Sequence, residues 1–555
     1  MKAFLRNNHR LLFYTAWIIL GLIQSSLTEL QDDEAYYWVY SKFLSWGYFD
    51  HPPMIALLIK IGYTIFPNEL GVRLFPLLLN VLSLVIIENL LGKKNPVLFY
   101  VIALSIAVIQ VSGFTAVPDI PLIFFTALFF FCYKKFVSRA SFINILLLGI
   151  SIALLFYSKY HAVLIVFFTL LSNLKLFTKY HIYLVGIIAL ILFVPHLWWQ
   201  YQHDWVSIRY HLFESNVNAY KPSFTGDYIV GQLLLPGPIA GFILLPAAFL
   251  YKPVNETDKA LRYTMIGIYA FFLLSSFRGK VEGNWTSPVL VSLIVLSFRF
   301  FDEKLRWQKI LYKLLPLTMI LVLFARIAML VDVIPVKEIQ TRYHAWKEWP
   351  KQMKENTKGL PIVFSNSYQR ASKYWFYSGQ ITYSQNWYRE RRNNYNFWPI
   401  EDSLLGKPVY FMDKYRLSLF PNSIKTSIGF VGFMYDSSFA SFAKIKISTD
   451  LKKYVAEEGK EIALKCHFEI PNNYSSFIQS HPFLNDTTRI AVFTKRGWVN
   501  DIFTGLSLQQ MNEQKVIEMK INPALPKGKY YFLFAINSGY YNATHNSNKI
   551  ELDIK

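Results

Sequence analysis

Acidic and aromatic residues crowd a short segment that follows the first apolar run of the chain. Residues 31–53 read QDDEAYYWVYSKFLSWGYFDHPP and hold four carboxylates and one histidine. A carboxylate beside a substrate hydroxyl or amine can accept its proton as a general base. If AYYWVYSKFL is helical, the adjacent Asp33 and Glu34 point about 100° apart and do not face the same atom. We therefore expect one of the two to act in catalysis and the other to support it.

The end of the same segment adds a second polar corner. Because Pro52 and Pro53 end any helix, WGYFDHPP presents Asp50 and His51 on a rigid turn. We expect this turn to face the same cavity as the helix before it. The residues of the segment expected to line that cavity are Tyr36, Tyr37, Asp50 and His51.

Further ionisable side chains lie at the ends of later apolar runs. Asp119 opens a run in FTAVPDIPL, where an ionisable group is costly and therefore points to function. The cations expected to hold a phosphate are Arg73, Lys159, Arg278 and Lys280. The set around the cavity is completed by His161 in SKYH and by Asn284 and Trp285 in RGKVEGNW.

Several of these residues also have an ordinary structural explanation. Tyrosine and tryptophan at span ends form the usual aromatic belt of a membrane protein, and Lys159 can extend to the interface. Arg278 and Lys280 fit simple loop charges, although they run against the usual charge bias of outer loops. Asp33 and Asp119 are the hardest to explain without a function.

The elements that carry these residues are expected to cross a membrane. The chain has 555 residues, of which 53% are hydrophobic, more than a soluble core of this size requires. Apolar runs near the width of a bilayer predict about eleven spans, at 11–29, 71–91, 96–113, 119–133, 142–157, 160–174, 181–199, 228–250, 263–277, 285–300 and 310–331. The pair within 142–174 is separated only by YSKYH and is the least distinct.

Charge predicts how these spans are oriented. With the N-terminus inside, sixteen lysines and arginines fall on inner segments and eight on outer segments before residue 331. Since cytoplasmic loops collect these residues, we expect a cytoplasmic N-terminus and, with an odd number of spans, an outer C-terminal domain. The first run lacks the small-residue pattern of a cleavage site and is expected to be an anchor. The net charge of +21 suits anionic lipid surfaces and requires no nucleic acid.

After residue 331 the sequence changes character. Residues 1–331 form the expected membrane domain, followed by an α/β domain over 332–438 and a β-sandwich over 439–555. A helix near 369–377 and short strands such as PIVF, PVYFM and IGFVGFM predict the α/β domain. Alternating segments such as EIALKCHFEI, RIAVFTK and KYYFLFAI predict the sandwich.

One loop of the outer part is strongly basic. NWYRERRNNYNFW contains Arg389, Arg391 and Arg392 among several rings. The loop suits contact with an anionic or sugar substrate, although a solvated basic loop is the simpler explanation. The β-sandwich segment shows no catalytic constellation.

The outer charges favour a transfer reaction. A general base, cations for a phosphate and access from the bilayer together suit a lipid-linked phosphate donor. A transporter or flippase of a lipid-linked or anionic substrate is the alternative, although such folds usually contain two related halves, and none is evident. A surface-assembly protein without catalysis is a third class, and it would tolerate neutral residues at Asp33 and Asp119.

The order of the motifs resembles a known superfamily. D-E-A-Y-Y, G-Y-F-D-H-P-P, G-V-R-L-F-P, P-D-I-P-L, S-K-Y-H and G-N-W-T-S-P, within residues 10–300, are similar to bacterial GT-C glycosyltransferases of the protein O-mannosyltransferase and lipid A aminoarabinose transferase type. The resemblance implies a polytopic α-helical enzyme of the bacterial inner membrane. Such an enzyme takes a polyprenyl-phosphate sugar as donor and inverts the anomeric carbon. The implied acceptor is lipid A, another glycan or a protein on the outer face.

The resemblance also implies roles for single residues. Asp33 matches the family's catalytic acidic position, with Glu34 beside it, and Asp119 matches a second acidic residue of the cavity. D-H-P-P stands where the aminoarabinose transferases have E-K-P-P, so Asp50 replaces a glutamate and His51 a lysine. That departure leaves open whether this corner binds a divalent cation, and no other cofactor is implied. Two prolines and a histidine alone do not make a metal site.

Overall fold

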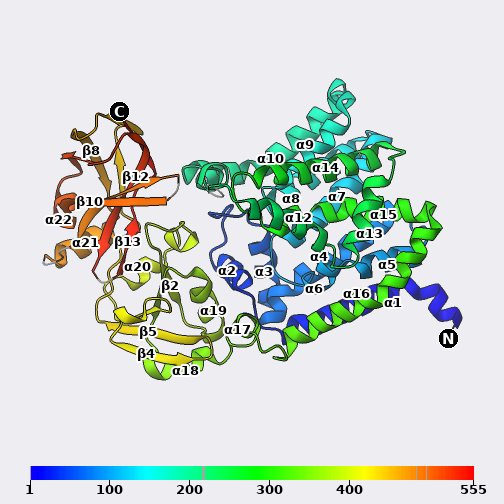
Figure 1. The fold of residues 1–555 in the computed structure, drawn as a ribbon, viewed down its shortest axis with the longest axis horizontal. Coiled ribbons are helices and arrows are strands. Elements are labelled where there is room, and N and C mark those ends of the chain that lie inside the picture. Colours follow the sequence, from blue (N-terminus) through cyan, green and yellow to red (C-terminus); the bar gives the residue numbers. More distant parts are fainter. Residues whose placement is uncertain (1, 215–218, 483, 485, 496, 540) are drawn as a thin grey trace. The chain divides into compact units, whose positions relative to one another are not determined.

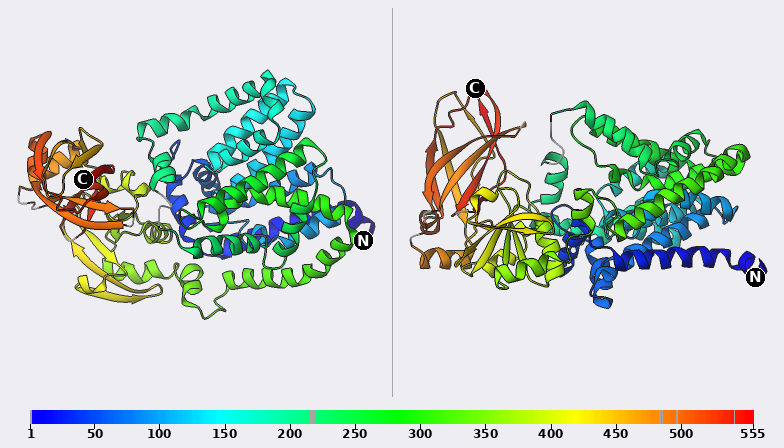
Figure 2. Two further views of the ribbon diagram at one scale, coloured as in Figure 1. Left: turned by 45° about the horizontal axis from the view of Figure 1, so that its top comes forward. Right: turned by 60° about the horizontal axis from the view of Figure 1, so that its bottom comes forward.

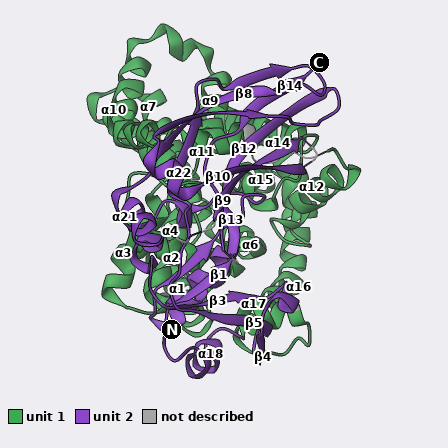
Figure 3. Cartoon of the chain, turned by 90° about the vertical axis from the view of Figure 1, so that its left-hand side faces the viewer, with its two compact units in different colours: residues 1–344 green, residues 345–555 purple. Residues whose placement is uncertain are grey.

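The computed structural model describes residues 2–214, 219–482, 484, 486–495, 497–539 and 541–555. The chain forms two compact units, unit 1 over Met1–His344 and unit 2 over Ala345–Lys555 (Figure 3). Unit 1 is helical, and every strand of the described residues lies in unit 2, as the two views of Figure 2 also show.

Unit 1 is a bundle of apolar helices (Figure 1). Its helices are α1 (Lys2–Leu27), α2 (Asp32–Lys42), α3 (Met54–Ile65), α4 (Glu69–Leu90), α5 (Pro96–Ser105), α6 (Ala107–Val111), α7 (Asp119–Ser138), α8 (Phe142–Ser158), α9 (Ala162–Ser172), η1 (Leu174–Thr178), α10 (Tyr180–Gln202), α11 (Val206–Arg209), η2 (Tyr210–Glu214), α12 (Pro222–Leu234), α13 (Gly241–Leu250), α14 (Glu256–Ser275), η3 (Gly283–Thr286), α15 (Val289–Glu303), α16 (Leu305–Leu330) and α17 (Lys337–Tyr343). Buried apolar residues from most of these helices form one large core.

The expected spans coincide with these helices. In the described part of the chain, α1 from Asn7, α4, α7, α10 and α16 are long and apolar enough to cross a membrane. The expected spans 96–113 and 228–250 are each divided between two shorter helices, α5 with α6 and α12 with α13. The sequence did not indicate α3, whose 12 residues are fewer than the roughly 20 that a bilayer requires. The predicted multi-pass helical fold is confirmed.

Local sequence explains where several helices begin. Asn68, Asn95 and Asn255 each accept a hydrogen bond from a backbone amide of the first turn of α4, α5 and α14. Such side chains satisfy amides that have no partner within the helix. The turn at Asp50-His51-Pro52-Pro53 separates α2 from α3, as the paired prolines predicted.

Unit 2 contains a mixed sheet and a two-sheet sandwich. The first sheet has the order β2-β1-β3-β5-β4, with β1 parallel to β2 and β3 and the other pairs antiparallel. Its strands are β1 (Ile362–Ser365), β2 (Thr382–Gln385), β3 (Val409–Asp413), β4 (Asn422–Thr426) and β5 (Gly429–Asp436). The helices of unit 2 are α18 (Trp349–Thr357), α19 (Tyr368–Ser378), η4 (Asn394–Asn396), α20 (Ile400–Leu404), η5 (Leu417–Leu419), α21 (Asn472–Ser480) and α22 (Leu508–Glu513). The predicted helix near 369–377 corresponds to α19.

The sandwich follows in the sequence. One sheet has the order β10-β9-β12-β14-β7 with β13 beside β12, and the other has the order β11-β8-β6. The strands are β6 (Lys446–Thr449), β7 (Lys453–Ala456), β8 (Ile462–Glu469), β9 (Thr487–Thr494), β10 (Gly497–Ser507), β11 (Val516–Ile521), β12 (Gly528–Ser538), β13 (Tyr541–His545) and β14 (Ile550–Ile554). Alternate side chains of both sheets enter one core. The pair β14 and β7 is parallel, a departure from the purely antiparallel sandwich expected.

Candidate active site

Several of the candidate residues of unit 1 gather at one end of the helix bundle. Contacts between side chains near the helix termini show that α1 and α8 end at this side of the bundle and that α4, α7 and α15 begin there. Residues that are far apart in the sequence therefore meet at this end. Two buried ion pairs organise it.

The first ion pair joins Glu34 of α2 to Arg73 of α4. Arg73 Nε donates to Glu34 Oε1 at 2.7 Å and its Nη2 donates to Oε2 at 2.6 Å. The remaining donors of the guanidinium reach the carbonyl oxygens of Ser25, Thr28 and Glu29 and the Thr28 hydroxyl. Both side chains have an exposed fraction of 0%. Arg73 is thus fully engaged inside the protein, whereas the sequence had suggested that it binds a phosphate.

Glu34 also joins separate segments. Its carboxylate accepts hydrogen bonds from the backbone amides of Gln31 at 2.9 Å and Ala116 at 2.8 Å. Burial alone would raise the pKa of Glu34, but the charge and hydrogen bonds of Arg73 outweigh burial and hold that pKa below its ordinary value. The charged Glu34 side chain therefore links α2, α4 and the segment before α7.

The neighbouring Asp33 lies differently. Asp33 is exposed in the first turn of α2, whereas Glu34 is buried. This is the divergence expected of adjacent residues on a helix. An exposed carboxylate is accessible to a substrate, and a saturated buried one is not. Tyr36 and Tyr37 are buried in the same helix, and the Tyr37 ring lies 5.4 Å from the His51 ring, centroid to centroid.

The second ion pair joins Asp119, the first residue of α7, to Lys159, which follows α8. Lys159 Nζ donates to Asp119 Oδ1 at 2.8 Å, and the two side chains are 6% and 10% exposed. Ser287 Oγ donates to Oδ1 at 2.7 Å, and Asn284 Nδ2 donates to Oδ2 at 3.0 Å. The motifs P-D-I-P-L, S-K-Y-H and G-N-W-T-S-P therefore meet at one carboxylate. We call these four residues the Asp119 cluster.

The Asp119 cluster keeps unused hydrogen-bonding capacity. An ammonium group has three N–H donors, and among the described residues Asp119 is the acceptor found for Lys159. Asn284 is exposed, so the cluster reaches the surface of unit 1. This pair can therefore interact with a ligand without first breaking apart.

Three histidines lie close to the same cluster. Burial lowers the pKa of His51 to about 4; Lys159 and His211 add to this shift, and Asp50 and Asp119 oppose it. His51 is consequently neutral near pH 7. Within the described residues, the Nδ1 atoms of His51 and His161 are buried and have no hydrogen-bond partner.

Aromatic and polar contacts hold these histidines in place. The His161 ring lies 5.1 Å from the Phe272 ring and 5.5 Å from the Trp285 ring, centroid to centroid. Tyr40 Oη donates a hydrogen bond to Asp50 Oδ1, and His211 Nε2 lies 3.0 Å from the Asp50 carbonyl oxygen. Across the described residues, no group of three or more His, Cys, Asp or Glu side chains is arranged to hold a metal ion.

Arg278 and Lys280 occupy the loop between α14 and η3. Both are exposed, and Lys280 Nζ lies 3.0 Å from Glu282 Oε1 with both side chains more than half exposed. The same short loop leads to Asn284, so the two cations flank the Asp119 cluster in sequence. Their own contacts do not place them inside it.

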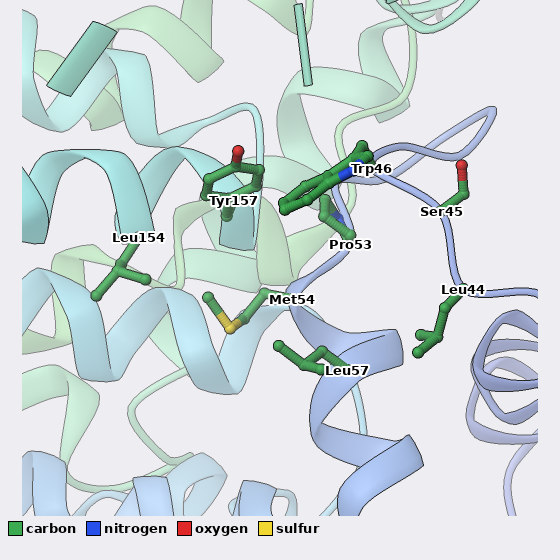
Figure 4. Close-up of a pocket in the computed structure, with 8 residues that line it drawn as sticks. All are labelled: Leu44, Ser45, Trp46, Pro53, Met54, Leu57, Leu154 and Tyr157. Atoms are coloured by element: carbon green, nitrogen blue, oxygen red, sulfur yellow. The ribbon is translucent and has the colours of Figure 1, made fainter. Parts of the chain in front are cut away.

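An apolar pocket lies beside the polar residues. Its volume is about 420 Å³. It is lined by Leu44, Ser45, Trp46, Pro53, Met54, Leu57, Leu154 and Tyr157 (Figure 4). Pro53 and Met54 directly follow the His51 turn, and Tyr157 lies two residues before Lys159. The pocket offers apolar surface next to the charged site.

Sequence reasoning missed some contributors to the site. Ser287 donates to Asp119, and its place in G-N-W-T-S-P was the one signal for it. Tyr40 of α2 and His211 of η2 both contact Asp50, and no motif marked either of them. Thr28 has no ionisable group and contacts Arg73 across 45 positions of sequence.

Comparisons with known proteins show which proteins this chain resembles. Residues 50–199 match the family described as dolichyl-phosphate-mannose-protein mannosyltransferase. Lipid A galacturonosyltransferase RgtD of Rhizobium johnstonii is 24% identical over 317 residues. That match covers 53% of this chain and 65% of the relative, so the chain spans less than two thirds of that protein's length.

Solved structures show the same fold. Crystal structures of ArnT from Cupriavidus metallidurans match with TM-scores of 0.57 when bound to undecaprenyl phosphate and 0.58 in the apo state. The sequence identities are 14% and 13%, and each match covers 77% of this chain and 98% of ArnT. The resemblance to GT-C glycosyltransferases that the motifs predicted is confirmed, and the chain is a multi-pass membrane protein of that fold.

Proposed function

We propose that this chain is a membrane glycosyltransferase that moves a sugar from a polyprenyl-phosphate donor to an acceptor, with inversion at the anomeric carbon. The observation that carries the proposal is the Asp119 cluster, in which three separated motifs meet beside an apolar pocket. An amphiphilic donor needs this combination of charge and apolar surface. The relative named for lipid A supports a lipid A-type acceptor, with other glycans and proteins as the remaining candidates.

The proposed reaction is a single displacement. The acceptor hydroxyl or amine attacks the anomeric carbon, and the bond from that carbon to the donor phosphate breaks. Asp33 accepts the acceptor's proton, and polyprenyl phosphate leaves as an anion. Of the two adjacent carboxylates, Asp33 is the exposed one, which suits it to meet the acceptor.

Lys159 is the proposed partner of the leaving phosphate. Its ammonium is fixed by Asp119 and retains donors, so it can stabilise charge that develops as the bond breaks. Arg278 and Lys280 are proposed to attract the donor from the exposed loop. Because Arg73 is saturated by Glu34 and backbone carbonyls, we assign it to the support of the site.

His51 is proposed to contact the donor phosphate as a neutral ring that gains a proton when the anion binds. Its Nδ1 is buried and has no partner in the described part of the chain, and its pKa of about 4 leaves it uncharged near neutral pH. A phosphate nearby favours the charged imidazolium and raises that pKa. Asp50 and His211 would then shape this corner through their own hydrogen bond.

The proposed location follows the charge pattern. A cytoplasmic N-terminus gives the inner segments sixteen basic residues and the outer segments eight. This orientation places the Asp119 cluster and unit 2 on the outer side of the bacterial inner membrane. The lipid-linked donor would then approach the site from the outer leaflet.

The direct test is a reaction with defined components. Purified protein is incubated with a panel of polyprenyl-phosphate sugars and lipid A, and the products are identified by mass spectrometry. We expect one donor to yield a sugar-modified acceptor together with released polyprenyl phosphate. Movement of the intact donor across vesicles, with no product from any donor, would instead indicate a transporter.

A further inference from the structure

A surface of unit 2 combines arginine side chains with exposed aromatic rings. It is formed by the loop after β2 and by strands β9 and β10. Its members are Trp387, Arg389, Arg489, Trp498 and Phe503, and we call them the Arg-aromatic surface. Trp498 is 43% exposed and Phe503 is 68% exposed, so both rings present apolar surface to the solvent.

The rings and guanidinium groups of this surface are stacked. The Arg389 guanidinium carbon lies 3.6 Å from the centroid of the Trp498 ring and 4.8 Å from that of Trp387. The Arg489 guanidinium carbon lies 5.1 Å from the centroid of the Phe503 ring. These distances are within the range of cation–π interactions, so the side chains are already ordered in one geometry.

A single carboxylate holds the stack together. Asp501 Oδ2 accepts from Arg389 at 3.2 Å, from Arg489 at 3.1 Å and from the Tyr388 hydroxyl at 2.6 Å. Its Oδ1 accepts from the Trp498 indole at 2.9 Å. One negative charge thus faces two positive ones, and the surface keeps a net positive charge. A pre-ordered site of this kind loses little conformational entropy on binding.

The neighbouring Arg391 and Arg392 also lie close to aromatic rings. The Arg391 guanidinium lies 5.2 Å from the centroid of the Tyr368 ring and donates to its hydroxyl at 3.0 Å. The Arg392 guanidinium lies 5.9 Å from the centroid of the Phe397 ring. Each arginine of the basic loop is therefore placed over an aromatic ring. A merely solvated basic loop would not require this order.

The chemistry of the surface selects its ligand. Exposed aromatic rings pack against the apolar face of a sugar ring, and a guanidinium fork recognises phosphate or carboxylate with paired hydrogen bonds. We propose that the Arg-aromatic surface binds an anionic glycan, that is, an oligosaccharide bearing phosphate or uronate groups. This site lies outside the helical unit and goes beyond the proposed transfer reaction.

The proposal is tested with the full-length protein in detergent. The probes are a fluorescent phosphorylated oligosaccharide, the same oligosaccharide after phosphatase treatment, and inorganic phosphate as a competitor. We expect the phosphorylated probe to bind at least tenfold more tightly than the dephosphorylated one. Inorganic phosphate should compete only weakly, because it lacks the sugar rings. Equal binding of both oligosaccharides, or full competition by inorganic phosphate, would overturn the proposal.

Matched variants locate the site. Trp498→Ala and Arg389→Gln should each weaken binding of the phosphorylated probe about tenfold or more, and Trp498→Phe should retain most of it. Phe430→Ala and Lys465→Ala remove an exposed ring on β5 and an exposed cation on β8, and should bind like the wild type. Wild-type binding by Trp498→Ala and Arg389→Gln would contradict the proposal.

A membrane surface is the competing partner. Vesicles of anionic phospholipid are therefore tested with the same variants, and we expect Trp498→Ala to leave vesicle binding unchanged. Equal loss of vesicle and glycan binding in that variant would assign the surface to lipid and overturn the glycan proposal. Thermal unfolding of Trp498→Phe and Trp498→Ala should match within a few degrees, which separates lost contact from lost folding.

Discussion

The two buried ion pairs of unit 1 have opposite characters. Glu34 and Arg73 are both 0% exposed and join through two hydrogen bonds, and backbone groups occupy their remaining sites. Asp119 and Lys159 join through one hydrogen bond and are 10% and 6% exposed. Neutral donors from Asn284 and Ser287 complete the second carboxylate. One pair is closed, and the other can accept a ligand.

This difference separates support from chemistry. A buried pair whose lone pairs and protons are all satisfied is strongly destabilising to break, because the remaining charge has no partner. A pair with spare donors can exchange interactions with a substrate as charge develops. We infer that the Glu34 pair fixes the position of α2, and with it Asp33, and that the Asp119 pair acts on the donor.

The largest effect on stability should come from Arg73→Met. Removing the guanidinium leaves the Glu34 carboxylate and three carbonyl oxygens without their donor, so we expect a loss of about 3–5 kcal/mol. Denaturation of the detergent-solubilised protein measures it. If Arg73→Met is as stable as the wild type and loses only affinity for the donor, Arg73 is one of the residues that bind the phosphate.

The second effect should appear in turnover. Lys159→Met removes the proposed phosphate partner, and we expect a roughly 10²-fold to 10³-fold lower kcat, typical of losing one oxyanion donor. Stability should fall less than in Arg73→Met, because the Asp119 side chain is 10% exposed whereas that of Glu34 is 0% exposed, and no backbone carbonyl loses its donor. Lys134→Met, at the other end of α7, is the matched control. If Lys159→Met and Lys134→Met lose kcat equally, the loss is not specific to the Asp119 pair, and the proposed difference between the two ion pairs is wrong.

Acid should lower the stability of the protein in two different pH ranges, one through His51 near the Asp119 cluster and one through Glu34 in the other ion pair. His51 has a pKa lowered to about 4 from 6.5, so the stability it contributes is present above pH 6.5 and is lost as the pH falls towards 4. We expect a loss of about 3 kcal/mol in that range, which His51→Gln should abolish. Glu34, whose pKa is lowered from 4.5, should lose its contribution only below pH 4.5. A loss between pH 6.5 and 4 that persists in His51→Gln would contradict this assignment.

The smallest effect should come from the exposed loop. The Lys280–Glu282 pair is more than half exposed, so Lys280→Ala should change stability by less than about 0.5 kcal/mol. We expect it to raise the KM for the donor a few-fold and to leave the KM for the acceptor unchanged. If Lys280→Ala has the same KM for the donor as the wild type, Lys280 does not help to bind the donor phosphate.

The sequence predicted the helices better than the contacts between them. Apolar runs mark the long helices because a helix needs a minimum length to cross a bilayer. The helix α3 was not predicted, because its apolar run is shorter. Asp33 and Glu34 were separated correctly by helical geometry. The partner of Glu34 was not predicted, since Arg73 lies 39 positions away and no local periodicity links them.

The Asp119 cluster illustrates the same limit. Its motifs were expected to surround one cavity, but the direct bond between Asp119 and Lys159 depends on how α7 and α8 pack. His211 could not be placed, because it lies in η2, a single short π-helical turn that is too short to give a periodic signal. In unit 2, alternation indicated several sandwich strands, whereas the stacking of Arg389 on Trp498 depends on contacts across 109 positions.

The central claim is that Asp33, held outward by the closed Glu34 pair, is the base of the reaction. The most direct measurement compares sugar transfer by Asp33→Asn with transfer by Asp32→Asn, which changes the adjacent carboxylate in the same way. We predict that Asp32→Asn retains activity within a few-fold, whereas Asp33→Asn binds the donor, remains folded and yields no product. Wild-type transfer by Asp33→Asn would contradict the account.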